Sequence, residues 1–239
     1  MSGAKPPRLA LIGAGKMGRA LAAVAAERGW PVVATIVRDG NERGGGITRE
    51  SLGGADVAVE FSVAAAAADN ILAAVRAGVP VVSGTTGWDA DRARVSREVI
   101  EARGALFWAP NFSIGVNLLW QLAERAGRLV GRLQGFDTHI VEVHHSAKKD
   151  APSGTAIELA RRVAGGLGHE VPITSVRTGS VPGTHELIFD APFEQLTLAH
   201  VARDRRVFAE GALTAAGWLI GRRGVFTMRD LLDMESTTS

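Results

Sequence analysis

The sequence predicts an α/β protein with two sheets, a parallel one in the N-terminal half and a mixed or antiparallel one in a C-terminal α+β domain. In the first half, short apolar runs alternate with helical segments, which is typical of βαβ units. Beyond Asn111, three strand-like segments follow one another without a helix between them. Because strands joined by short turns form antiparallel or mixed sheets, this change of rhythm indicates a second domain.

The composition is that of a folded protein without cysteine chemistry. The chain has 239 residues, of which 46% are hydrophobic and 22% charged, enough for one large core or two modest ones and unlike a disordered chain. It contains no cysteine, which excludes disulfides, thiolate nucleophiles, iron-sulfur clusters and cysteine-ligated zinc.

The charge does not indicate a nucleic-acid partner. The formal net charge is only +2, although the sequence pI is about 9.5. Without tyrosine or cysteine, almost no group titrates between histidine and lysine, so a small excess of base raises the pI steeply.

Nothing in the sequence suggests export or a membrane partner. The apolar run Leu9 to Ile12 meets Gly13 after four residues, too short for a signal-peptide core. No stretch approaches 18 uncharged apolar residues, the length of a spanning helix. We expect a cytoplasmic protein.

Glycines that follow apolar or helical runs divide the first half into elements. Strands are expected at Leu9–Ile12, Val32–Val37, Val57–Phe61, Val79–Ser83 and Ala105–Ala109, and helices at Arg19–Arg28, Ala64–Ala77 and Asp89–Arg103.

The second half mixes strands and helices in a different order. Helices are expected at Val116–Leu133, Gly154–Ala164 and Val207–Ile220, and strands at Thr138–Val143, Ile173–Arg177, His185–Phe189 and Leu196–Ala202. We expect the last helix to return to the first domain. The expected domains are therefore residues 1–111 with 207–239, and residues 112–206.

A glycine-rich turn follows the first expected strand and opens the first helix. Its residues are Gly13-Ala14-Gly15-Lys16-Met17-Gly18. In a Rossmann-like fold such glycines permit a tight turn, approach of the backbone to a pyrophosphate and close packing of helix on strand. The pattern predicts a dinucleotide site at Gly13, Gly15 and Gly18, with a purely structural glycine turn as the alternative.

The end of the second strand carries the residues that would select the cofactor, in the run Val37-Arg38-Asp39. An acid here would bind the ribose hydroxyls of NAD, a role that Asp39 fits if the strand ends one residue later. Arg38 suits the 2′-phosphate of NADP instead. The run favours NADPH mildly, leaves NADH possible, and also fits a solvated arginine in a loop.

A second polar turn, Ser83-Gly84-Thr85-Thr86-Gly87, follows another expected strand. Glycine lets a ring approach the backbone, and threonine supplies hydroxyl and N–H groups to a nicotinamide amide. A generic turn is the alternative. Phe61 and Ser62 end the preceding strand and could lie beside the same ligand.

The densest group of reactive side chains lies in the run from His144 to Ala156, HHSAKKDAPSGTA. Gly154 and Thr155 stand at an expected helix start, whose N–H groups bind carboxylates. Lys148 adds a cationic donor, and histidine transfers protons near neutral pH. Other zinc ligands are not evident nearby, so we expect no metal; a merely basic loop is the remaining alternative.

Together these motifs resemble the 4-hydroxy-tetrahydrodipicolinate (dihydrodipicolinate) reductase family. The histidine-lysine segment is highly specific, whereas the first glycine turn is shared with many dehydrogenases. The resemblance covers about residues 8 to 230 and includes Ala109–Asn117, Arg177–Gly179, Gly183–Glu186 and His200–Ala212.

The resemblance implies reduction of a small cyclic imine or enamine with two carboxylates by hydride from NADPH or NADH, at an interdomain cleft. It implies His144 as proton donor, Lys148 as the group that binds and polarises the substrate, and Gly154 and Thr155 as carboxylate ligands. His145, His185 and Arg205 match further substrate-binding positions. The matching cofactor contacts are Gly13, Lys16, Met17, Phe61, Gly84, Thr85, Thr86, Ala109, Asn111 and Phe112. A homotetramer formed by the C-terminal sheets is also implied.

The sequence departs from the family pattern on the adenosine side. Val37 stands where many relatives have the ribose-binding acid, which again favours NADPH through Arg38, and the chain is short around Asp39 to Leu52. Two alternative functions remain at this point: a related NAD(P)-dependent amino-acid dehydrogenase, and a non-catalytic nucleotide-sensing module.

Overall fold

The structure, a computed structural model, describes residues 5–233 and divides into two compact units. Within the described residues, the first unit runs to Phe112 and resumes at Phe208, and the second consists of Ser113–Val207. Each unit has a sheet and a hydrophobic core of its own. The predicted fold class, a Rossmann-like parallel sheet with a second α+β unit, is confirmed.

The first unit is built on a six-stranded parallel sheet with the order β10-β5-β4-β3-β1-β2. Its inner strands are almost wholly buried apolar runs, as expected for parallel strands covered on both faces. The strands are β1 (Leu9–Ile12), β2 (Val32–Ile36), β3 (Val57–Glu60), β4 (Val81–Ser83), β5 (Ala105–Trp108) and β10 (Gly224–Phe226).

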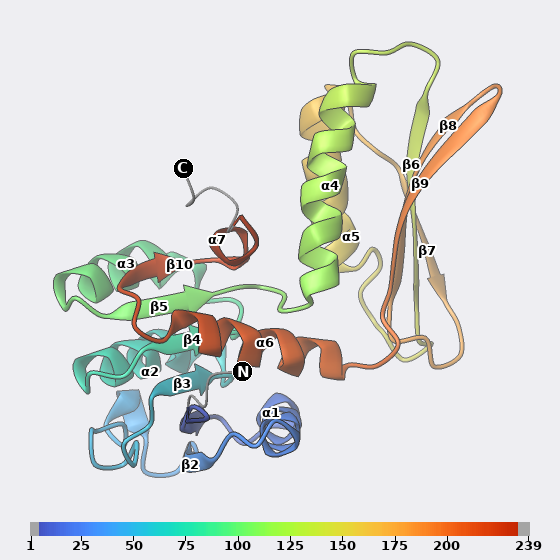
Figure 1. Cartoon of the computed structure of the whole chain (residues 1–239). Helices are drawn as coiled ribbons and strands as arrows, with labels where there is room; N and C mark the ends of the chain where they lie inside the picture. The colour runs from blue at the N-terminus through green and yellow to red at the C-terminus, as the bar shows by residue number, and fades with distance from the viewer. Residues whose placement is uncertain (1–4, 234–239) are drawn as a thin grey trace. The chain divides into compact units, whose positions relative to one another are not determined.

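Helices cover this sheet (Figure 1). The core beneath α2 and α3 includes Ala10, Ile12 and Leu106. Phe107, the next residue of β5, points to the opposite face, where its ring lies 5.9 Å from that of Trp218 in α6. The helices are α1 (Lys16–Glu27), α2 (Ala64–Arg76), α3 (Arg92–Glu101), α6 (Arg206–Leu219) and α7 (Met228–Leu232), with 3-10 turns η1 (Glu42–Gly44) and η2 (Asp89–Asp91).

The second unit has a four-stranded sheet with the order β7-β6-β8-β9. β6 pairs with β7 in parallel and with β8 antiparallel, and β8 pairs antiparallel with β9, so the sheet is mixed. The strands are β6 (Asp137–His144), β7 (Ile173–Arg177), β8 (Thr184–Ala191) and β9 (Glu194–Val201).

Helices α4 (Ile114–Val130) and α5 (Gly154–Leu167) lie side by side against one face of this sheet (Figure 1). Small residues allow their close approach: a Cβ on Gly127 would lie 2.5 Å from the carbonyl oxygen of Val163. Ile140, Leu187 and Phe189 point into the core under the helices and are fully buried.

The opposite face of the same sheet has no helix over it within the unit. Because side chains alternate along a strand, the positions between the core residues all point to this face. They include five β-branched apolar side chains that are half-buried or exposed: Val141, Val143, Val176, Ile188 and Val201.

Most expected elements are present, with two kinds of difference. β10 and α7 were not predicted, because a strand of three residues and a helix of five give almost no periodic signal. The helix expected over Asp89–Arg103 is divided into η2 and α3, α1 begins at Lys16 rather than Arg19, and β2 ends at Ile36. Among residues 5–233, no helix has the length and apolar character that crossing a membrane requires.

Candidate active site

The three glycines of the first turn have different physical roles. Gly13 has a φ of +107°, and a Cβ on it would overlap the carbonyl oxygen of Phe61. A Cβ on Gly18 would overlap the carbonyl oxygen of Gly13. A Cβ on Gly15, the N-cap of α1, would meet no atom within 4 Å. Two glycines are thus needed for packing, while the third leaves the amino end of α1 open to an anion.

Four other predicted cofactor residues of this unit, Phe61, Gly84, Ala109 and Phe112, form one neighbourhood. A Cβ on Gly84 would overlap the Phe61 ring, which lies 5.7 Å from the ring of Phe112. The backbone N–H of Ala109 donates to the carbonyl of Ser83 at 3.2 Å. The ends of β3, β4 and β5 therefore bring residues from three separate parts of the sequence together.

A buried carboxylate that sequence reasoning missed supports this neighbourhood. Glu60, the last residue of β3, has an exposed fraction of 0%. It accepts hydrogen bonds from Ser83 Oγ at 2.6 Å, Thr85 Oγ1 at 2.9 Å and the N–H of Ser62 at 3.0 Å. Thr85 Oγ1 also accepts from the N–H of Ser62 at 2.8 Å. The Thr85 hydroxyl is thus engaged within the protein, whereas the Thr86 side chain is exposed at the tip of the turn.

The remaining predicted cofactor residues are exposed or half-buried. The side chains of Lys16 and Arg38 are exposed, so both cations are accessible to a ligand. Met17 and Asn111 are half-buried.

In the second unit, the candidate site is centred on Glu142 and His144, two residues apart on β6 and facing the helices. Nδ1 of His144 donates to Oε2 of Glu142. The other carboxylate oxygen, Oε1, accepts from Nη2 of Arg177 at 2.6 Å and from the N–H of Ser153 at 3.3 Å. Glu142 has an exposed fraction of 0%. Sequence reasoning did not include Glu142, Ser153 or Arg177 among the site residues.

Burial and charge set the protonation of this group. Burial alone would raise the pKa of Glu142, but hydrogen bonds from Arg177 and His144 lower it to about 2. Burial lowers the pKa of His144 against the opposing effect of Glu142, and the charges of Lys148 and Arg177 lower it further. The pKa of His185 is lowered to about 4 by burial and by His144. Near neutral pH, Glu142 is therefore ionised and His185 neutral.

Ser153 connects this group to α5. As N-cap it accepts from the N–H of Ala156 at 3.2 Å, and its Oγ lies 3.1 Å from Nε2 of His185. The rings of His144 and His185 are 5.1 Å apart, edge to face. Gly154 is exposed, and a Cβ on it would meet no atom within 4 Å. The first N–H groups of a helix have no intrahelical partners, so this end of α5 suits a carboxylate.

The other predicted substrate residues, Lys148, His145 and Arg205, have different surroundings. Nζ of Lys148 is 2.7 Å from both carboxylate oxygens of the exposed Asp150. His145 is half-buried, and its N–H donates to the carbonyl of Val181 at 2.8 Å. Arg205 lies exposed in the connection between β9 and α6, and in the described part of the chain it makes no hydrogen bond to Glu142 or His144.

Glu142, His144 and His185 are close enough to be considered as metal ligands, since one ligand atom from each lies within 4.8 Å of the others. Both oxygens of Glu142 are, however, already engaged by His144 and Arg177. A guanidinium group against the carboxylate repels a second cation. The arrangement therefore suits proton transfer better than metal binding.

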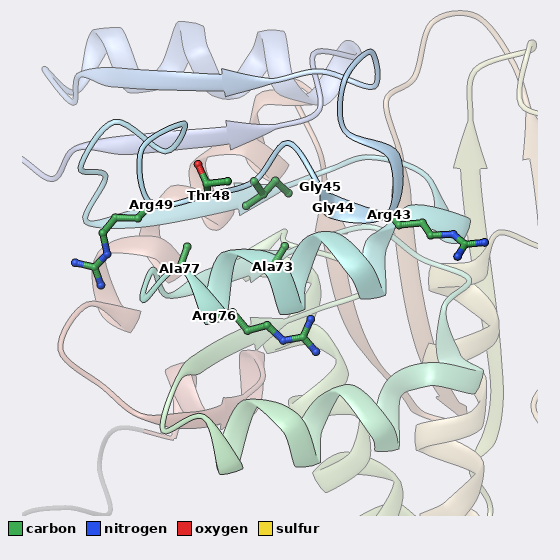
Figure 2. Close-up of a pocket in the computed structure, with 9 residues that line it drawn as sticks. Arg43, Gly44, Gly45, Thr48, Arg49, Ala73, Arg76 and Ala77 are labelled. Atoms are coloured by element: carbon green, nitrogen blue, oxygen red, sulfur yellow. The ribbon is translucent and has the colours of Figure 1, made fainter.

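An open hollow of about 450 Å³ lies beside α2 in the first unit (Figure 2). Arg43, Arg49 and Arg76 line it, but they do not converge on one point: Arg49 extends away from the other two, and Arg76 is paired with Glu98 at 2.7 Å. None of the predicted cofactor residues lines this hollow, which is therefore separate from the candidate site.

The fold and these residues define a class. A parallel sheet with an open glycine turn before α1, and a second unit that presents a histidine and an uncovered helix end, are features of a two-unit oxidoreductase that uses a dinucleotide.

Comparisons with known proteins identify the family. Residues 7–112 match the model of the dihydrodipicolinate reductase N-terminus, and residues 115–232 match that of its C-terminus. The 4-hydroxy-tetrahydrodipicolinate reductase of Thiobacillus denitrificans is 38% identical, with 95% of this chain and 99% of the relative covered. That of Christiangramia forsetii is 35% identical, with 94% and 97% covered. The chain belongs to the dihydrodipicolinate reductase family, whose members are oxidoreductases that use a nicotinamide cofactor.

The fold also matches a solved structure, a dipicolinate-bound dihydrodipicolinate reductase from Paenisporosarcina sp. TG-14. The TM-score is 0.80 at 22% identity, with 95% of this chain and 100% of the other covered.

The glycine turn gives a prediction with a matched control. Gly18→Ala should lower the free energy of unfolding by about 1–3 kcal/mol, because its Cβ overlaps the Gly13 carbonyl. Gly15→Ala should cost less than about 1 kcal/mol, since its Cβ meets open space, but should weaken binding of the nicotinamide cofactor. Urea unfolding and a fluorescence titration measure the two effects. Equal destabilisation by both substitutions would contradict these separate roles.

Proposed function

We propose that this protein reduces 4-hydroxy-tetrahydrodipicolinate, or its dehydrated form dihydrodipicolinate, to tetrahydrodipicolinate in the synthesis of lysine and diaminopimelate. The observation that carries the proposal is the link from His144 through Glu142 to Ser153, which sets a proton-transferring group beside a helix end suited to a carboxylate. Membership of the family and the names of the curated relatives support the choice of substrate.

The first unit fits a nicotinamide dinucleotide. The open N-cap at Gly15 suits the pyrophosphate, and the contact between Gly84 and the Phe61 ring suits a flat ring against the backbone. Thr85 contributes its backbone while its hydroxyl holds the turn. The other proposed contacts in this region are Lys16, Met17, Thr86, Ala109, Asn111 and Phe112. When bound, the reduced cofactor supplies a hydride to the substrate ring.

The second unit binds the diacid. The N–H groups of Gly154 and Thr155 hold one carboxylate with the help of the α5 dipole. Lys148 exchanges its exposed partner Asp150 for the substrate; an ion pair of this kind contributes little stability, so the exchange costs little. His145, His185 and Arg205 are proposed to bind the remaining polar groups.

His144 supplies the proton. Addition of a hydride leaves an electron-rich centre on the ring, and an imidazolium group can protonate it. Because burial lowers the pKa of His144 below its usual 6.5, its imidazolium form is a stronger acid than a free imidazolium and gives up its proton more readily.

We further propose NADPH as the preferred cofactor, with NADH possible. The exposed Arg38, two residues beyond the end of β2, is suitable for a 2′-phosphate. The biosynthetic role supports a cytoplasmic location.

We also propose a homotetramer formed through the second sheet. The face opposite α4 and α5 carries Val141, Val143, Val176, Ile188 and Val201, and an uncovered sheet face of this kind needs an apolar partner. Copies of the same chain supply one by symmetry.

The purified protein should oxidise NADPH only when aspartate semialdehyde, pyruvate and the upstream synthase are all present. Initial rates should be higher with NADPH than with NADH, and Arg38→Ala should reduce that difference. Oxidation with an amino-acid or keto-acid substrate alone would favour the dehydrogenase alternative, and tight NADPH binding without turnover would favour a nucleotide sensor.

His144→Gln should lower kcat by about 10²- to 10⁴-fold, the usual contribution of general acid catalysis, with little change in NADPH affinity. Lys148→Ala should also lower substrate turnover. Lys149→Ala is the matched control, because Lys149 is the adjacent exposed lysine. Unchanged kcat in His144→Gln would remove His144 from proton transfer.

Ile188→Lys should break the assembly without unfolding the chain, because Ile188 lies on the uncovered face of β8. Light scattering after gel filtration should give four chains for the wild type and fewer for the variant. Ile100→Lys, at an exposed apolar residue of α3, should keep the wild-type mass. A monomeric wild type would contradict the proposed tetramer.

A further inference from the structure

Glu142 is buried too deeply to touch a substrate, yet its carboxylate connects three separate parts of the second unit. It is 0% exposed, and its two oxygens receive hydrogen bonds from β6, β7 and the residue before α5. Its effect on any reaction must therefore pass through the groups that it holds.

The first of these groups is the ring of His144. Because Nδ1 is directed at Glu142, Nε2 is the nitrogen left for proton transfer. Gly183 keeps this nitrogen uncovered: a Cβ at position 183 would lie 3.0 Å from Nε2 of His144. Nδ1 of His144 therefore faces Glu142, and Nε2 faces the space left beside Gly183.

The second group is Arg177. Its Nη2 donates to Glu142 Oε1 at 2.6 Å and to the carbonyl of Asp150, also at 2.6 Å. Arg177 therefore ties the carboxylate to the connection that carries Lys148. The N–H of Ser153 donates to the same Oε1, which fixes the start of α5 relative to β6.

From these contacts we propose that Glu142 is the positioning residue of the proton transfer: it holds His144 so that Nε2 carries the transferred proton, and it keeps the ring in register with the amino end of α5. That this proton goes to a substrate rests on the proposed function, but the pairing of His144 with Glu142 does not.

The proton count is simple. The hydride adds to one carbon of the substrate ring, and the electron pair of the reduced double bond takes the proton from Nε2 of imidazolium His144. The His144 ring becomes neutral and keeps its Nδ1 proton, which stays hydrogen-bonded to the ionised Glu142 throughout. Water returns one proton to Nε2, so each turnover consumes one hydride and one proton.

The charges that face His144 act in opposite directions. Glu142 on β6 favours the imidazolium, whereas Arg177 on β7, Lys148 in the following connection and His185 on β8, when charged, oppose it. Burial also favours the neutral ring. Removing Glu142 should therefore lower the pKa of His144, and removing Arg177 should raise it.

The test begins with the full-length wild type labelled with ¹⁵N in histidine. At a pH above the His144 titration, NMR without substrate should show the neutral ring with its proton on Nδ1; a proton on Nε2 in the neutral ring would overturn the proposal. In Glu142→Gln the His144 pKa should fall, and in Arg177→Gln it should rise. A Glu142→Gln protein that titrates like the wild type would also overturn it.

Kinetics give the second readout. Glu142→Gln should lower kcat by about 10- to 100-fold, as removal of a partner that orients a functional histidine does, with little change in the KM for NADPH. The alkaline decline of kcat should move to lower pH. In a His144→Gln background the same substitution should add little, whereas a merely structural role predicts an equal loss in both backgrounds.

Glu158→Gln is the matched control, because Glu158 is an acid of the same unit that pairs with Arg161 and Arg162 on α5. It should leave kcat and the His144 titration unchanged. If Glu142→Gln does not fold, Glu142→Asp keeps the charge and should retain the Nδ1 proton; loss of that proton would contradict the proposal. A wild type with the expected NMR behaviour but no reductase activity would disprove the proposed function alone.

Discussion

The second unit depends on the burial of one carboxylate. An ionised group removed from water costs several kcal/mol unless it is fully paired. Glu142 meets this requirement with an arginine, a histidine and a backbone N–H. Because each partner comes from a different part of the chain, satisfying the carboxylate also fixes the relative positions of β6, β7 and the start of α5.

The first unit buries a carboxylate by a different chemistry. Glu60 is surrounded by hydroxyl and N–H donors from Ser62, Ser83 and Thr85. These neutral donors hold the turn after β4 against the end of β3. In both units an acid near the carboxyl end of a strand organises the loops at that edge. Glu60 does so through hydroxyl groups beside the proposed cofactor residues, and Glu142 through a charge pair beside a histidine.

The sequence could predict the parts of the site that repeat a local pattern. A glycine turn between a strand and a helix, and SGTA at a helix start, have short-range causes, and the structure has helices at Lys16 and Gly154. Glu142 was missed although a signal was present: it lies two residues after Ile140 and two before His144, and so shares their face of the strand. Its partner Arg177 comes from β7, and only the pairing of β6 with β7 brings the two together.

Other differences also arise from long-range causes. β10 has three residues and is a strand because the edge of β5 is available to pair with it. The role of the Thr85 hydroxyl could not be read from SGTTG, because the acceptor that engages it is on another strand. Local propensity thus predicts where elements begin, whereas the use of a particular polar atom depends on which strand lies beside it.

The charge balance of the second unit has a consequence for proton transfer under the proposed function. In the free protein, burial is the largest influence on the pKa of His144 and lowers it against the effect of Glu142, and the smaller effects of Lys148 and Arg177 add to the preference for the neutral form. A dicarboxylate bound at the start of α5 would add negative charge and neutralise Lys148. Negative charge near an imidazole favours the imidazolium. The substrate itself would therefore raise the fraction of His144 that can donate a proton, while Glu142 keeps the ring directed as that fraction changes.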